Sequence, residues 1–190
     1  SIRRRSQIIN LRNDLSIKSL RGNVDTRINK LKEKEFDAII LSVAGLKRLS
    51  LDHLISFIFS EDEILPASCQ GAIGIQMKSN NDDLKNFLSP LNHKLTRDLC
   101  IVERDVLMGI KANCNSPIGI FATIENNKMK LKCDIFNHDG NKIYSNTLFD
   151  MYSQTSEIGK KMGKDILLNL GQKKIDNLDI IKNDFDYTTK

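Results

Sequence analysis

A glycine turn between an apolar run and a helical pattern constrains the fold of this chain more than any other feature. The apolar run 15–20 stops at Gly22, and apolar residues at helical spacing begin with Val24. A strand that enters a helix through a glycine leaves backbone N–H groups at the start of the helix, where anions bind. Arg21 and Arg27 stand on either side of this turn. The turn is therefore a candidate site for an acidic ligand group.

A second strand-to-helix turn repeats this arrangement further along the chain. The apolar run 37–43 leads into residues 44–48, which end in Arg48. Apolar runs that alternate with helical patterns predict a parallel sheet covered on both faces, and ligands gather at the carboxyl ends of such strands. Because arginine pairs bidentately with carboxylates and phosphates, these residues favour a ligand with several acidic groups. The arginines at 3–5 could equally form a solvated helix face.

The second half of the chain predicts a small α+β domain. A long amphipathic helix is expected over about 93–110, because apolar residues recur there at helical spacing. It leads into a loop that presents Cys114 among small and turn-forming residues. Turn signals separate three expected strands of an antiparallel sheet, at 118–125, 128–136 and 142–149. A helix at about 155–170 should pack across this sheet.

Together these patterns predict an α/β chain in which a parallel-sheet α/β domain precedes a small α+β domain with a three-stranded antiparallel sheet. The parallel-sheet α/β domain is expected at 1–71, and a connecting segment follows at 72–91. The α+β domain that carries Cys114 and a polar tail are expected at 92–172 and 173–190.

Composition and charge argue against several classes of function. The net charge is +5, and residues 1–50 hold the basic excess, with 12 basic and 5 acidic side chains. Their single aromatic side chain, Phe36, is too few for a nucleic-acid stacking surface, so nucleic acid is not an expected partner. No apolar run approaches the roughly 20 residues that a membrane helix needs. The four cysteines show no CxxC spacing, which argues against a metal site or disulfides and favours a reducing compartment.

Several motifs follow one another in the order and spacing of one family. They are Ser1–Arg4, Leu20–Arg27, Asp37–Leu41, Ala44–Leu49, Leu65–Ala67 with Gln70–Ala72, and Cys114 with Pro117–Gly119. Through these motifs the chain resembles porphobilinogen deaminases, also called hydroxymethylbilane synthases, from residue 1 to about residue 170. That family joins four porphobilinogen molecules head to tail, releases ammonia at each step, and acts in tetrapyrrole and haem synthesis.

The resemblance implies a transferase with a covalently attached dipyrromethane cofactor. It implies a thioether to Cys114, a residue type whose thiolate can capture an electrophilic pyrrole. Further cofactor contacts are implied for Ser1, Arg3, Arg4, Arg21 and Gly22. Substrate contacts are implied for Arg21, Arg27 and Arg48, because each pyrrole carries an acetate and a propionate group. The resemblance implies that the domain at 1–71, the second of the family's three domains, has a fold like that of a periplasmic binding protein.

Two departures from the family shape these expectations. The catalytic aspartate of the family lies in a first domain that has no counterpart here, so the catalytic residue is unknown and residues 1–190 alone are expected to be inactive. Residues 72–91 would return to that missing domain, which is an expected partner together with porphobilinogen. The cysteine loop reads Lys-Ala-Asn-Cys-Asn-Ser-Pro where the family usually has Glu-Gly-Gly-Cys-Gln-Val-Pro. The loop is therefore stiffer, with one charge reversed.

The remaining expectations concern assembly, location and a rival function. The complete protein is expected to be a monomer in the cytoplasm or a plastid, without a nucleic-acid or membrane partner. The alternative is a non-catalytic module that keeps the arginine cleft and binds a polycarboxylate without turnover. Mutation of Cys114 separates the two, because only the enzyme would lose its bound pyrroles and its product.

Overall fold

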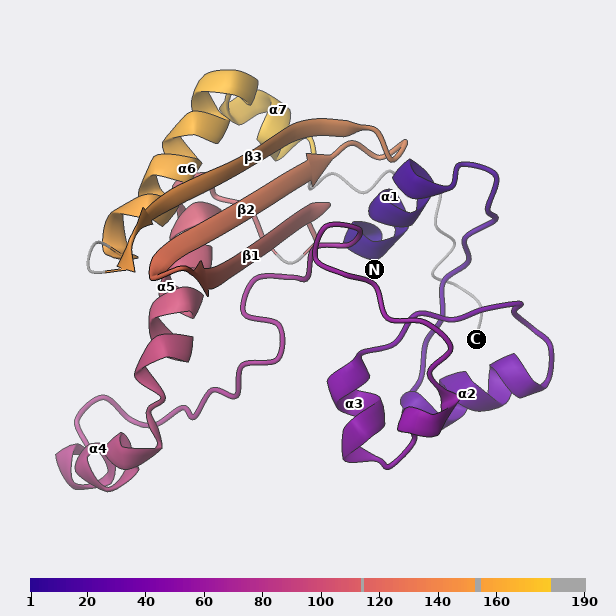
Figure 1. Cartoon of the computed structure of the whole chain (residues 1–190), viewed down its shortest axis with the longest axis horizontal. Coiled ribbons are helices and arrows are strands. Elements are labelled where there is room, and N and C mark those ends of the chain that lie inside the picture. Colours follow the sequence, from indigo (N-terminus) through magenta and orange to yellow (C-terminus); the bar gives the residue numbers. More distant parts are fainter. Residues whose placement is uncertain (114, 153–154, 179–190) are drawn as a thin grey trace. The chain divides into compact units, whose positions relative to one another are not determined.

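The computed structural model describes residues 1–113, 115–152 and 155–178 of the chain (Figure 1). The chain divides into two compact units. The first consists of Ser1–Asn13 and Glu61–Lys190, and the second is Asp14–Ser60. These divisions differ from the domain limits expected at 71 and 91, which stay predictions.

The centre of the first unit is a three-stranded antiparallel sheet. Its strands are β1 (Ile118–Glu125), β2 (Lys128–Phe136) and β3 (Lys142–Met151), in the order β1-β2-β3. Asn126 and Asn127 connect β1 to β2 with φ angles of 49° and 61°, the left-handed pair that a tight hairpin turn needs. The antiparallel meander predicted from the sequence is confirmed.

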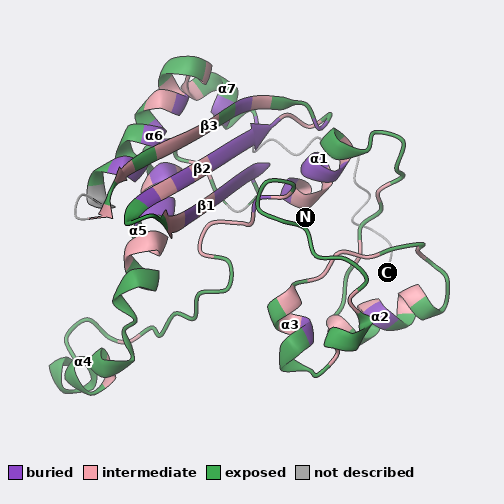
Figure 2. Cartoon of the chain, in the orientation of Figure 1, coloured by how far each residue is buried: buried purple, intermediate pink, exposed green. Residues whose placement is uncertain are grey.

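Two long helices cover one face of this sheet (Figure 1). They are α5 (Lys94–Gly109) and α6 (Thr155–Leu170). Alternate residues of β2 are wholly buried beneath them, namely Met129, Leu131, Cys133 and Ile135. Figure 2 colours the buried residues of these strands and helices purple. The two-residue period of the strand and the apolar stripes of the helices therefore meet in one core.

The two helices approach closely because small residues line their crossing. A Cβ atom on Gly159 of α6 would collide with the carbonyl oxygen of Val102 in α5. A Cβ on Gly109 would lie 3.5 Å from the Cα of Gly163. Glycine is therefore required at 159 by the neighbouring backbone rather than by its own conformation.

The helix α1 (Ile2–Leu11) fastens a distant segment to the same unit. Residues 65–70, which we call the 65–70 connection, run between α1 and β1. Leu65 is buried, and its backbone N–H donates to Gln7 Oε1 across 2.7 Å. The N–H of Ile120 in β1 donates to the carbonyl oxygen of Pro66 across 3.1 Å. The connection is thus held from both sides.

Residues 72–91 make a weaker contribution to the first unit. They include the short helices α4 (Asp82–Leu88) and η2 (Ser89–Leu91), preceded by a stretch without regular secondary structure. Several large apolar side chains here face solvent, with exposed fractions of 81% for Ile73 and 78% for Phe87. Figure 2 shows α4 almost entirely in green. The segment thus leaves apolar surface uncovered.

The second unit contains the helices α2 (Val24–Lys32), α3 (Val43–Arg48) and η1 (Asp52–Leu54). The predicted strands 15–20 and 37–43 do not form within Asp14–Ser60, and Val43 instead begins α3. The parallel sheet is therefore not part of this structure. A parallel strand is stable only when neighbouring strands satisfy its backbone groups, and no described segment pairs with either run.

The end of the described chain differs from the expected polar tail. Residues 172–178 include the helix α7 (Gln172–Asp176), and Ile175 and Leu178 are buried in the core. Their apolar side chains make this short stretch part of the packed unit. Residues 179–190 lie outside the described residues.

Candidate cofactor-binding site

The Gly22 turn precedes the N-terminus of helix α2, which is capped by a side chain. The Asn23 side chain caps α2 by accepting a hydrogen bond of 2.8 Å from the N–H of Thr26. Gly22 has a φ of +115°, and a Cβ atom there would lie 2.8 Å from Cγ2 of Thr26. Both observations require glycine at this position.

Two of the predicted arginines meet this turn. Arg21 is exposed beside Gly22, and Arg27 returns from the first turn of α2 to donate an Nε hydrogen bond of 2.8 Å to the Gly22 carbonyl oxygen. Two positive charges thus flank the first turn of a nine-residue helix, whose dipole also favours anions. Arg21, Gly22 and Arg27 therefore lie together at this turn.

Arg48 lies elsewhere in the second unit. It is exposed in the last turn of α3, while Leu46 of the same helix is buried. Ser42 caps α3 through a long contact of 3.4 Å from the N–H of Gly45. A shallow hollow of about 490 Å³ begins at Lys47 and is otherwise lined by Asp52 and residues 55–58. Arg48 therefore faces solvent, and the residue before it, Lys47, lines the hollow.

Arg3 is buried, and its guanidinium is hydrogen-bonded within the first unit. Only 7% of its surface is exposed, and it donates to the Leu65 carbonyl oxygen across 2.5 Å and to Gln70 Oε1 across 3.1 Å. Burial, with Arg4 nearby, lowers the pKa of Arg3 to about 10. The guanidinium therefore stays charged at neutral pH and holds the 65–70 connection against α1.

The neighbouring predicted residues lie on the same helix. Arg4 is half-buried in α1, and Ser1 is exposed at the residue that precedes the helix. The structure therefore groups Ser1, Arg3 and Arg4 in the first unit, and the other predicted arginines in the second. Cys114, the predicted attachment point, lies outside the described residues. Its described neighbours Asn113 and Ser116 are hydrogen-bonded across 3.2 Å.

Glu103 is a buried carboxylate that the sequence motifs do not indicate. The residue is 6% exposed, and its carboxylate accepts hydrogen bonds from the N–H of Cys69 across 2.5 Å and of Ala122 across 2.9 Å. Burial raises the pKa of Glu103, and the two N–H groups partly oppose that shift. A signal was present, because Glu103 interrupts the apolar stripe of α5 between Leu99 and Val106. The residue joins the 65–70 connection to α5 and β1.

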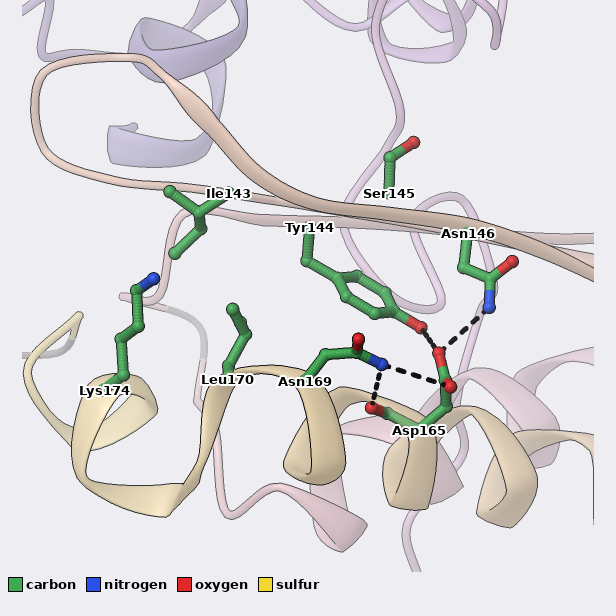
Figure 3. A pocket seen from close by; sticks show the side chains of 8 residues that line it. All are labelled: Ile143, Tyr144, Ser145, Asn146, Asp165, Asn169, Leu170 and Lys174. Atoms are coloured by element: carbon green, nitrogen blue, oxygen red, sulfur yellow. Dashed lines mark hydrogen bonds between the residues drawn. The ribbon is translucent and has the colours of Figure 1, made fainter.

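A separate open cavity of about 570 Å³ lies between β3 and the helices α6 and α7 (Figure 3). Asp165, one of the lining residues, accepts hydrogen bonds from Tyr144 across 2.5 Å and from Asn146 across 3.0 Å. These bonds lower the pKa of Asp165, while burial and Asp165 raise that of Tyr144. Asn169 also donates to the carboxylate. No predicted site residue lines this cavity. The Asp165 carboxylate is engaged in hydrogen bonds that join β3 to α6.

The described residues set limits on other kinds of site. Within residues 1–113, 115–152 and 155–178, no helix combines the length and apolar character needed to cross a membrane. The same residues contain no group of three or more His, Cys, Asp or Glu side chains placed to hold a metal ion.

Two protein-family models match consecutive parts of the chain. Residues 1–86 match the model for the porphobilinogen deaminase dipyrromethane cofactor-binding domain, and residues 98–168 match the porphobilinogen deaminase C-terminal domain. Guanidinium groups at the Gly22 turn fit the carboxylate side chains of such a pyrrole cofactor. The two matches follow each other along the chain and leave few residues outside them. The chain therefore belongs to the porphobilinogen deaminase family, a transferase family of tetrapyrrole biosynthesis that uses porphobilinogen and a dipyrromethane cofactor.

Proposed function

We propose that this chain provides the second and third domains of a hydroxymethylbilane synthase. The reaction is the head-to-tail condensation of four porphobilinogen molecules with release of ammonia, and dipyrromethane supplies the primer on which the rings are added. The observation that carries the proposal is the pair of consecutive family matches over 1–86 and 98–168. The cationic Gly22 turn supports it, because the growing product gains two carboxylates with each ring.

Arg21, Arg27 and Arg48 bind the acidic side chains of the substrate in this proposal. Arg21 and Arg27 flank one helix start, where the backbone dipole adds to their positive charge. Their bidentate pairing with acetate and propionate groups would orient a pyrrole ring for attack, so the contribution is positioning and electrostatic stabilisation. Gly22 matters because its lack of a side chain keeps the turn closed against Thr26.

Ser1, Arg3 and Arg4 bind the cofactor together with Arg21 and Gly22 in the same proposal. A guanidinium has five N–H donors, and Arg3 spends two of them on Leu65 and Gln70. In this proposal a cofactor carboxylate would use donors that Leu65 and Gln70 leave, although only 7% of Arg3 is exposed before the cofactor binds. Cys114 holds the cofactor through a thioether, for which a soft thiolate nucleophile is the suitable residue type.

We further propose that residues 72–91 pair with an additional domain that supplies the catalytic acid. The exposed apolar side chains of Ile73, Ile75 and Phe87 support this proposal, since they leave an uncovered apolar surface in a stretch whose backbone pairs with no described strand. Residues 1–190 alone are then inactive, and the complete protein is a monomer of the cytoplasm or a plastid.

The proposed function is tested by the intact mass of the purified chain after incubation with porphobilinogen, with Ehrlich staining for pyrroles. We expect an added mass of two linked pyrroles that maps to Cys114 once the additional domain is supplied, and no turnover by residues 1–190 alone. A Cys114→Ser variant should lose the pyrroles. Binding of pyrroles that survives this substitution would instead support a non-catalytic polycarboxylate-binding module.

A further inference from the structure

Two thiols that the proposed function does not use meet beside the 65–70 connection. Cys69 belongs to the connection and Cys100 to α5, and both are half-buried. The Cys69 Sγ donates a hydrogen bond of 3.5 Å to the carbonyl oxygen of Cys100. Cys133, in contrast, is wholly buried in the core. Cys69 and Cys100 thus combine proximity with partial access to solvent.

The backbone of Cys69 is held in place independently of its thiol. Its N–H donates to the Glu103 carboxylate across 2.5 Å, and Glu103 follows Cys100 by three residues on α5. Residues three apart on a helix lie on the same face, so this bond presents Cys69 to the face that carries Cys100. The thiol of Cys69 can therefore change partner without releasing the 65–70 connection from α5.

We propose that Cys69 and Cys100 form a reactive thiol pair that a peroxide oxidises to an intramolecular disulfide. The Cys69 thiolate attacks a peroxide oxygen, the O–O bond breaks, and Cys69 becomes a sulfenic acid. The Cys100 sulfur then attacks the Cys69 sulfur, the S–O bond breaks, and the disulfide forms. The two sulfurs together lose two electrons to the peroxide, and the two thiol protons leave in two molecules of water.

The order of the two steps follows from the surroundings of the thiols. Burial, with Cys69 close by, raises the pKa of Cys100 to about 11. Cys100 is therefore rarely a thiolate at neutral pH and acts second, as the resolving thiol. The product would link the 65–70 connection covalently to α5, next to Gln70, which accepts a hydrogen bond from Arg3.

Tryptic digestion separates the four thiols, so the pair can be tested directly. Cleavage after Lys and Arg places Cys69, Cys100, Cys114 and Cys133 in the peptides 49–78, 98–104, 112–128 and 133–142. The reduced chain is treated with hydrogen peroxide, denatured, alkylated, digested and analysed by mass spectrometry. We expect peptides 49–78 and 98–104 to be joined, with alkylation lost from both together.

A Cys69→Gly variant is the control, because glycine accommodates the φ of +58° at this position and the fold should persist. In this variant Cys100 should remain open to alkylation after peroxide treatment. A Cys114→Ser variant should keep the joined peptides. The proposal is overturned if Cys114 is joined to either thiol, or if Cys69 and Cys100 stay reduced or oxidise separately without a link.

Discussion

Arg3 donates a hydrogen bond of 2.5 Å to the carbonyl oxygen of Leu65, a residue 62 positions further along the chain. The bond is buried, and Gln7 supports it by exchanging two hydrogen bonds with the same residue, Leu65. A residue that the sequence marks as a ligand contact is therefore also part of the packing. Substitution of Arg3 should therefore lower the stability of the fold even in the absence of a ligand.

We expect Arg3→Lys to lower the free energy of unfolding by about 1–3 kcal/mol, the cost of leaving a buried hydrogen-bonding group without its partner. Lysine cannot reproduce the planar guanidinium that reaches both Leu65 and Gln70. Urea unfolding monitored by circular dichroism measures the change. The matched variant Arg21→Lys alters an exposed side chain and should shift stability by less than about 0.5 kcal/mol. Equal losses in both variants would contradict a structural role for Arg3.

Glu103→Gln should also lower the free energy of unfolding, by about 1–3 kcal/mol. The NH2 group of glutamine would replace one carboxylate oxygen and would face a backbone N–H donor from which it cannot accept a hydrogen bond. The two donors are the N–H groups of Cys69 and Ala122. Unfolding in urea at pH 7 gives the difference. A stability equal to that of the unchanged chain would show that one of the two bonds contributes nothing.

The pH dependence of Glu103 has a definite sign. Burial raises its pKa above the ordinary value of 4.5, so the folded chain binds this proton more tightly than the unfolded chain. The stabilisation from protonated Glu103 is complete below pH 4.5 and is lost as the pH rises through the folded pKa. The difference in unfolding free energy between the unchanged chain and Glu103→Gln should therefore depend on pH in this window. A difference that stays constant there would be evidence against the raised pKa.

Gly159→Ala should cost about 1–3 kcal/mol, as expected for an extra methyl group forced into a packed interior. The new Cβ would collide with the Val102 carbonyl oxygen and push α6 away from α5. Gly74→Ala is the matched control, since nothing lies within 4 Å of its added Cβ, and it should change stability by less than about 0.5 kcal/mol. Thermal unfolding of both variants measures the contrast, and a stable Gly159→Ala chain would mean that the helices separate at little cost.

The features that the sequence predicted correctly are those with local signals. The β1–β2 hairpin follows from alternating residues and from Asn126 and Asn127 at the turn, and the Gly22 turn lies within a few residues of Arg21 and Arg27. The prediction of parallel strands at 15–20 and 37–43 failed, because each strand requires a partner strand elsewhere in the chain and a local apolar run does not specify that partner. The bond from Arg3 to Leu65 is equally non-local. No pattern around residue 3 could have indicated it.

Gly22→Ala is expected to disturb both the fold and the proposed binding site. A left-handed φ costs a residue with a side chain about 1–2 kcal/mol, and the new Cβ would press on the Thr26 side chain. The start of α2 should then loosen, and with it the bond from Arg27 Nε to the Gly22 carbonyl oxygen. Circular dichroism should show the destabilisation, and the fraction of chains that retain pyrroles should fall.

The matched variant for this test is Gly45→Ala in α3. Its added Cβ would lie at an ordinary 3.8 Å from Ser42, and alanine within a helix is favoured over glycine by about 0.5–1 kcal/mol. Gly45→Ala should therefore stabilise the chain slightly and leave pyrrole retention unchanged. If Gly22→Ala retained pyrroles as well as Gly45→Ala did, the arginines would bind their ligand without the turn. Conversely, a loss confined to Gly22→Ala would tie the conformation of this one glycine to binding.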